Sequence, residues 1–176
     1  YCLELGQTRQ EFFDDLTKAK AVIKNKINQD TYSLVFPCNQ WNDEYLSVLE
    51  DLEILCYRGN EKNWLYKAVN RGDEKIITRV IRLLDSYFNL SGHSLKSLED
   101  ISFSKPYNIS SSRFLRPVSK ELFFAENLRL NRIKKSMTYA AQNNKLFHLW
   151  WHPHNFGKDT SSNIIFLNKI LEHFNL

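Results

Sequence analysis

Cysteine is scarce in this sequence, and long apolar runs are missing. The 176 residues include only Cys2, Cys38 and Cys56, and an odd number of such widely spaced cysteines does not form a disulfide framework. No apolar run approaches the roughly 18 residues that a membrane-spanning helix needs. We therefore expect no membrane span, and a reducing cytoplasm is the simplest location for the protein.

The sequence also lacks the marks of a nucleic-acid-binding protein. Its net charge of +4 is spread through segments of mixed sign, such as residues 73–82. The one denser basic patch, residues 129–135, has no interleaved aromatic side chains, and we interpret it as the solvated face of a helix. No nucleic-acid partner is expected.

The chain opens with Tyr1 and without a charged and then apolar leader segment. We expect a piece of a longer protein, so the lack of a signal peptide carries little weight. The length suits about one domain. With 43% hydrophobic and 14% aromatic residues, the composition is ample for a packed core.

Hydrophobic periodicity predicts helices that alternate with short strands. A capping box at Thr8 and Glu11 predicts a helix that runs to Lys26, and Asn42 is expected to cap the next helix. The remaining expected elements are strands at residues 32–36, 54–57 and 145–152, and helices at residues 42–52, 73–88, 121–143 and from Ser161 or Ser162 onward. The Ser-rich residues 91–120 are expected to form a long ordered loop.

Two of these helices carry clear apolar periodicity. One side of the second helix is formed by Tyr45, Leu49 and Leu52. The 73–88 helix repeats apolar residues at helical spacing, namely Ile76, Val80, Leu83, Leu84 and Tyr87. Alternation of helices and strands predicts an α/β fold with parallel strands and right-handed crossovers. Three strands are too few for a closed barrel, so an incomplete one is expected.

Three of the five histidines lie within seven residues, at the end of the most apolar predicted strand. With a period of two, one face carries Leu146, His148, Trp150 and His152, and the other carries Phe147, Leu149 and Trp151. Pro153 ends ladder pairing, and loops after parallel strands build sites. His152 and His154 are therefore candidate catalytic or ligating residues. The alternative is an aromatic strand whose imidazoles satisfy neighbouring backbone groups.

Three segments resemble the C-terminal half of a bacterial branch of the polysaccharide deacetylase family: Val-Phe-Pro-Cys-Asn-Gln at residues 35–40, Cys-Tyr-Arg-Gly-Asn at 56–60, and residues 147–157. The similarity spans nearly the whole chain, and the His-Pro-His strand end is its most distinctive part. The resemblance implies an α/β fold, an incomplete (β/α) barrel in which residues 1–176 form a single partial catalytic domain. It also implies hydrolytic removal of acetyl groups from an N-acetylated glycan or sugar precursor.

The resemblance further implies a divalent metal of the zinc type in the full-length parent. In this family the metal is held by an Asp from an Asp-Asp segment and by two histidines from a His-x-x-x-His segment. Neither segment is present here, and residues 1–4 look like the sequence just after the second metal-binding histidine. We therefore expect the metal ligands to lie outside this chain.

His152 matches the family's late strand-end histidine, which the resemblance makes the general acid, with His154 as the second choice. An ordinary imidazole, with a pKa of about 6.5, suits protonation of an amine leaving group near neutral pH. An indole face suits a sugar ring, so Trp150 and Trp151 are candidate walls of the substrate pocket. Core packing is the alternative for both tryptophans.

Asn39, Gln40 and Arg58 are further candidates for substrate binding, because they follow predicted strands. A turn and capping role for Asn39 and Gln40 is an equal alternative, and a lone arginine such as Arg58 often serves as a surface or ion-pair residue. The resemblance implies an Arg where this chain has Cys38, and a thiol does not replace a permanently charged bidentate group. We assign no role to His93 or His173.

Two other functions remain open. A non-catalytic carbohydrate-binding or scaffold protein would keep the fold and the aromatic pocket without the metal set. A zinc site built from His148, His152 and His154 is the third possibility.

Overall fold

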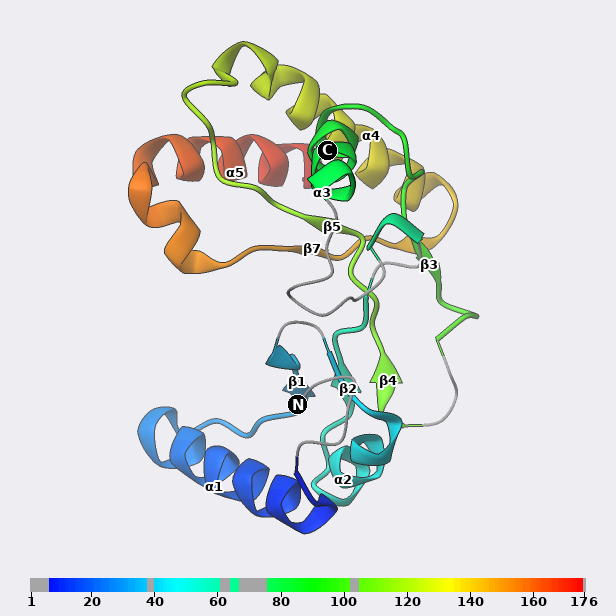
Figure 1. The fold of residues 1–176 in the computed structure, drawn as a ribbon, viewed down its shortest axis with the longest axis vertical. Helices are drawn as coiled ribbons and strands as arrows, with labels where there is room; N and C mark the ends of the chain where they lie inside the picture. Colours follow the sequence, from blue (N-terminus) through cyan, green and yellow to red (C-terminus); the bar gives the residue numbers. More distant parts are fainter. Residues whose placement is uncertain (1–6, 38–39, 61–63, 67–75, 102–104, 176) are drawn as a thin grey trace. The chain divides into compact units, whose positions relative to one another are not determined.

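The computed structural model describes residues 7–37, 40–60, 64–66, 76–101 and 105–175. These residues form a mixed α/β structure with small parallel sheets, and no barrel closes among them. The chain divides into two compact units, the first containing residues 1–60 and 99–110 and the second containing residues 61–98 and 111–176 (Figure 1). The predicted α/β class is thus confirmed in coarse form, whereas the (β/α) barrel and the single catalytic domain stay predictions.

The first unit begins with helix α1 (Arg9–Ile27), whose start was predicted by the capping box. The Thr8 side chain accepts a hydrogen bond from the backbone N–H of Glu11, and the Glu11 carboxylate accepts one from the backbone N–H of Thr8. Asn28 ends the helix in a left-handed conformation, which suits a C-terminal cap. The predicted limits of this helix are confirmed to within about a residue.

A short 3₁₀ turn, η2 (Asp43–Tyr45), leads into α2 (Leu46–Asp51), and Asn42 caps this segment as predicted. Tyr45 and Leu49 are buried with Phe12, and the Phe12 and Tyr45 rings lie 4.7 Å apart. The other buried members of this core are Leu16, Phe36, Val48, Ile54 and Tyr57. The first half of α1 therefore packs against the predicted apolar side of α2.

The sheet of the first unit is parallel, in the order β1 (Ser33–Leu34), β2 (Cys56–Tyr57) and β4 (Tyr107–Asn108). Strands β1 and β2 lie in segments predicted as strands. The prediction of a continuous loop over residues 91–120 was wrong, because β4 adds to the edge of β2 and two further strands lie in the same segment. Each of these strands has only two residues, which is too short to produce a recognisable alternation.

The second unit contains three α-helices among its described residues. They are α3 (Ile76–Tyr87), α4 (Glu126–Gln142) and α5 (Thr160–Phe174), with short 3₁₀ segments η3 (Trp64–Tyr66), η4 (Phe123–Ala125) and η5 (Pro153–Lys158). The core formed by α4, α5, η5 and Leu115 consists of Leu115, Leu130, Ile133, Phe156, Phe166 and Ile170. Asp159 caps α5 by accepting a hydrogen bond from the backbone N–H of Ser162. The helix begins at Thr160, one or two residues before the predicted start at Ser161 or Ser162.

Two pairs of short strands complete the second unit. Strands β5 (Arg113–Phe114) and β7 (Leu149–Trp150) are parallel, whereas β3 (Lys96–Ser97) and β6 (Lys145–Leu146) are antiparallel. The expectation of exclusively parallel strands was therefore wrong for β3 and β6. The predicted histidine strand is also divided into β6 and β7.

Two helix faces differ from the sequence-based expectation. The apolar residues of α3 point outward, with Ile76 76% and Val80 50% exposed, whereas Asp85 is fully buried. In α4, Arg129 and Arg132 are buried, so the solvated face predicted for residues 129–135 was wrong at these two positions. Arg129 pairs with Glu126, and Arg132 donates to Ser136 Oγ at 2.8 Å. Among the helices that the structure describes, none is long and apolar enough to cross a membrane.

Candidate functional site

The carboxyl end of β7 carries the predicted histidine cluster of the second unit. Parallel pairing places Phe114 opposite Trp150, and the backbone N–H of Leu115 donates to the carbonyl of Trp150 at 2.8 Å. Just upstream, the backbone N–H of His148 donates to Ser112 Oγ at 3.0 Å. These hydrogen bonds fix the register of β7 against β5. They therefore also fix the position at which His152 follows the strand.

The two faces of this segment separate as the period of two predicted. Phe147, Leu149 and Trp151 pack against the core of the second unit, and the Trp151 ring stacks on Phe156 with centroids 5.8 Å apart. On the opposite face, the rings of Phe114 and Trp150 lie 4.6 Å apart. The structure therefore places Trp150 on the histidine face and Trp151 on the core side.

His152 lies directly after β7 and joins this aromatic group. Its ring meets the Trp150 ring edge-on, at a centroid distance of 5.3 Å and an interplanar angle of 89°, and it lies 5.8 Å from the Phe114 ring. The His154 ring stacks on His152 at 5.3 Å and 25°. The structure therefore brings together His152, His154 and Trp150, three of the residues predicted from the sequence.

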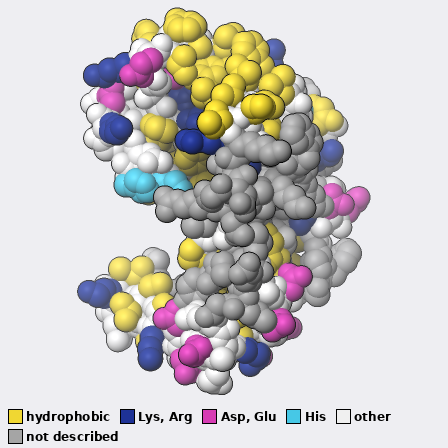
Figure 2. Space-filling view, in the orientation of Figure 1, with side chains coloured by type: hydrophobic (Ala, Val, Ile, Leu, Met, Phe, Trp, Pro, Cys, Tyr) yellow, Lys and Arg dark blue, Asp and Glu magenta, His cyan; other side chains and the backbone are white. Residues whose placement is uncertain are grey.

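The turn after His152 exposes both imidazoles. Pro153 begins η5, and the backbone N–H of Asn155 donates to the carbonyl of His152 at 3.0 Å. His152 and His154 are both exposed, and histidine side chains are visible on the surface of the second unit (Figure 2). Solvent-accessible imidazoles can exchange protons with a bound substrate near neutral pH.

The described residues do not form a metal site. No group of three or more His, Cys, Asp or Glu side chains among them is arranged to hold an ion. The three-histidine zinc site considered from the sequence is therefore not formed by His148, His152 and His154. The half-buried His148 is held through its backbone by Ser112.

The remaining predicted residues lie in the first unit, after its strands. Arg58 follows β2, is half-buried, and donates its backbone N–H to the carbonyl of Leu34 at 3.0 Å. Burial lowers the pKa of its guanidinium. Gln40 donates its backbone N–H to the carbonyl of Pro37 at 3.1 Å, which is a turn contact. Asn39 and its neighbour Cys38 lie outside the described residues.

The structure adds Asn108 to the polar groups at the strand ends of the first unit. Asn108 is the last residue of β4, and its side chain is hydrogen-bonded to the Tyr57 hydroxyl. Burial raises the pKa of Tyr57, and the nearby Asp43 acts in the same direction, whereas the bond to Asn108 opposes them. Sequence reasoning missed Asn108 because it lies in the segment predicted as a loop.

Gly59 is required for this arrangement. A Cβ atom at Gly59 would lie 2.0 Å from Asn108 Oδ1, so a larger residue would displace the amide. A glycine just after a strand is a signal for close backbone approach, and this signal was present in the Tyr-Arg-Gly sequence.

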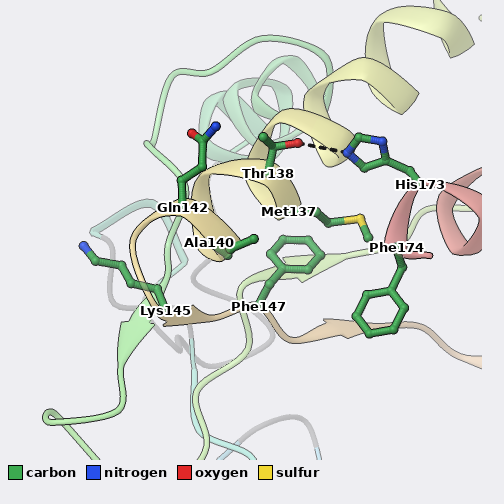
Figure 3. A pocket seen from close by; sticks show the side chains of 9 residues that line it. Met137, Thr138, Ala140, Gln142, Lys145, Phe147, His173 and Phe174 are labelled. Carbon is green, nitrogen blue, oxygen red and sulfur yellow. Dashed lines mark hydrogen bonds between the residues drawn. The ribbon is translucent and has the colours of Figure 1, made fainter. Parts of the chain in front are cut away.

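A cavity of about 510 Å³ lies elsewhere in the second unit, and none of the predicted site residues lines it (Figure 3). Met137, Ala140, Phe147 and Phe174 give it apolar walls. Thr138 Oγ1 and His173 Nε2 are hydrogen-bonded at 2.9 Å at its edge, and Lys145 lies at another edge. This space can accept an apolar group, and no carboxylate is among the described residues that line it.

His93, to which the sequence assigned no role, lies in a half-buried polar contact. Its Nδ1 is 3.0 Å from Ser136 Oγ, and its ring stacks on Tyr139 at 4.6 Å. Burial lowers its pKa, and the charges of Arg132 and Arg113 lower it further. His93 therefore links the loop after α3 to α4.

Comparisons of this chain with protein-family models, with curated proteins and with solved structures find no match.

Proposed function

We propose that this chain is the acid-bearing part of an N-deacetylase that acts on an N-acetylated glycan or sugar precursor by metal-assisted hydrolysis. The observation that carries the proposal is the position of His152, an exposed imidazole directly after the parallel strand β7 and edge-on to Trp150. The resemblance of the three sequence segments to polysaccharide deacetylases supplies the reaction.

His152 would donate the proton that the departing amine needs. An amine leaves an acyl centre as the neutral amine only when its nitrogen is protonated, and the imidazolium form of His152 would donate this proton and become the neutral imidazole. The backbone contacts of β7 and η5 hold His152 at the strand end. His154, stacked on His152, would be the second proton donor at the same place.

Trp150 and Phe114 would bind the sugar next to the acid. Their rings contact each other at 4.6 Å and both approach His152. Aromatic rings suit the apolar C–H face of a pyranose. A sugar placed against Trp150 would therefore present its acetamido group near the His152 imidazole.

A divalent metal would polarise the amide carbonyl and activate water in the full-length parent. The described residues of this chain do not fit a metal site, so the proposal gives them no role in holding the ion. Their part is to bind the sugar and to donate the proton.

The proposal is tested by acetate release from N-acetylglucosamine oligomers by the full-length parent, with and without a chelator. We expect chelator-sensitive release, and a loss of about 100-fold or more in His152→Ala, the usual contribution of general acid catalysis. His173→Ala is the matched control, because His173 lies at the end of α5 away from this cluster. Full activity of His152→Ala would refute the acid role.

A non-catalytic carbohydrate-binding protein is the second candidate. The described residues do not include a metal set, while Trp150 and Phe114 form an aromatic group beside His152. This function predicts saturable oligomer binding, measured by tryptophan fluorescence, that Trp150→Ala abolishes, together with no acetate release by the parent.

A further inference from the structure

The outward face of α3 forms one side of a cavity that is distinct from the histidine cluster and from the cavity of Figure 3. The space of about 440 Å³ is lined by apolar side chains of α3 and by three arginines: Ile76, Val80, Leu83, Arg79, Arg82 and Arg116. The three apolar side chains are 36–76% exposed. Figure 2 shows hydrophobic side chains gathered on this face of the second unit, with basic side chains beside them.

Three arginines line this cavity, and no carboxylate of the described residues is among its walls. Burial lowers the pKa of Arg116; Tyr66 and Tyr87 oppose this shift, while the charges of Arg129 and Arg82 add to it. Arg129 is already paired with Glu126, and among the described residues Arg116 has no ion-pair partner. Positive charge is therefore concentrated along this cavity.

Arg82 is held in place before any ligand binds. Its Nε donates to the carbonyl of Leu65 at 2.6 Å, and its guanidinium lies 5.5 Å from the centre of the Tyr66 ring. The Tyr66 hydroxyl in turn donates to Asp85 Oδ2 at 2.8 Å, and Asp85 is fully buried. Ordering the guanidinium in advance reduces the entropy cost of binding an anion.

We propose that this cavity binds a phosphate monoester that carries an apolar substituent. Arginine presents planar forks of N–H donors that match phosphate oxygens, and its charge is permanent. Two negative charges on the phosphate would offset the repulsion among three guanidiniums. The apolar substituent would cover Ile76, Val80 and Leu83, which water otherwise contacts.

The test is calorimetric titration of the chain with phenyl phosphate, inorganic phosphate and phenol. Phenyl phosphate is expected to bind at one site per chain, at least tenfold more tightly than inorganic phosphate, and phenol is expected not to bind. Arg116→Gln should weaken phenyl phosphate binding at least tenfold. Val80→Glu, which puts a carboxylate at an exposed helical position inside the cavity, should do the same.

Arg9→Gln is the matched control, since it removes an exposed guanidinium from α1 in the first unit, and it should bind as the parent does. Thermal unfolding of each variant shows whether it is folded. Val80→Glu keeps the test decisive if Arg116→Gln does not fold, because Val80 is half exposed. Equal binding by both variants and the parent, or no binding of phenyl phosphate by the parent, would overturn the proposal. Equal affinity for inorganic phosphate and phenyl phosphate would overturn the role of the apolar face.

Discussion

The carboxylate of Asp85 and the guanidinium of Arg113 form a buried ion pair, with Oδ2 3.4 Å from Nη1 and the two side chains 0% and 4% exposed. Asp85 also accepts hydrogen bonds from the Ser91 hydroxyl and backbone N–H, both at 2.7 Å, and from the Tyr66 hydroxyl. One buried acid therefore connects the end of α3, the loop after it, η3 and β5.

Replacing Asp85 with Asn should destabilise the protein by about 3 kcal/mol, because Arg113 would remain buried without its opposite charge. Urea unfolding followed by circular dichroism measures the change. Asp30→Asn is the control, since this carboxylate pairs with Lys24 at the surface, and its loss should cost less than about 1 kcal/mol. Equal costs for the two variants would contradict the role assigned to Asp85.

Asp85 should also make stability depend on pH in the acid range. Burial alone raises the pKa of Asp85, but the hydrogen bonds from Ser91 and Tyr66 and the charge of Arg113 outweigh it, so the pKa in the folded protein is lowered. The unfolded chain then binds more protons than the folded chain between the two pKa values, and stability falls as pH falls.

The contribution of Asp85 should be fully present above pH of about 4, the ordinary pKa of an aspartic acid, and should be lost as the pH drops through the lowered value. Urea unfolding at several pH values between about 2 and 6, on the parent and on Asp85→Asn, measures it. The free energies of unfolding should converge at the acid end. A constant difference across this range would show that Asp85 does not titrate with a lowered pKa.

Thr8→Ala should cost about 1 kcal/mol, because it removes the hydroxyl that accepts the backbone N–H of Glu11 at the start of α1. Thr17→Ala is the matched control, since Thr17 lies inside the same helix and its exposed hydroxyl bonds only the carbonyl of Phe13. Thermal unfolding should separate the two variants. A larger loss in Thr17→Ala would argue against the capping box as the helix start.

Gly59→Ala should destabilise the first unit by roughly 1–3 kcal/mol, the usual cost of overpacking. The added methyl would meet the Asn108 amide, with Oδ1 2.0 Å away. Gly157→Ala is the control, because nothing lies within 4 Å of a Cβ at that position. Adding Asn108→Ala to Gly59→Ala should relieve the clash, so that the two changes together cost less than the sum of their separate effects. Strictly additive costs would show that the two residues do not interact.

Short-range sequence patterns predicted the structure correctly where the pattern was strong. The capping box gave the start of α1, and the period of two separated Trp150 and His152 from Trp151. Pairing partners are not visible in a local pattern, which is why β3, β4 and β5 were missed. Arg129 is buried because Glu126 and the Arg116 carbonyl accept hydrogen bonds from its guanidinium. The apolar face of α3 turns outward because Asp85, on the same helix, is held inside by hydrogen-bond donors from other segments. Apolar periodicity predicted the opposite for α3, and the run of basic residues predicted the opposite for Arg129.

The sequence likewise predicted only the part of the candidate site that lies on one continuous segment. A single apolar strand ending in His-Pro-His identified His152 and His154, whereas Asn108 became visible only when β4 was placed beside β2. The arginines of the α3 cavity are separated by up to 37 positions, from Arg79 to Arg116, and no spacing rule joins them.

The most direct test of the proposed function compares two substrates in the full-length parent and in its His152→Ala variant. Release of acetate from N-acetylglucosamine oligomers requires protonation of an amine, whereas p-nitrophenyl acetate has a leaving group that departs without a proton. If His152 is the general acid, the variant should lose about 100-fold or more on the amide and much less on the ester. Equal losses on both substrates, or no loss on either, would contradict the account.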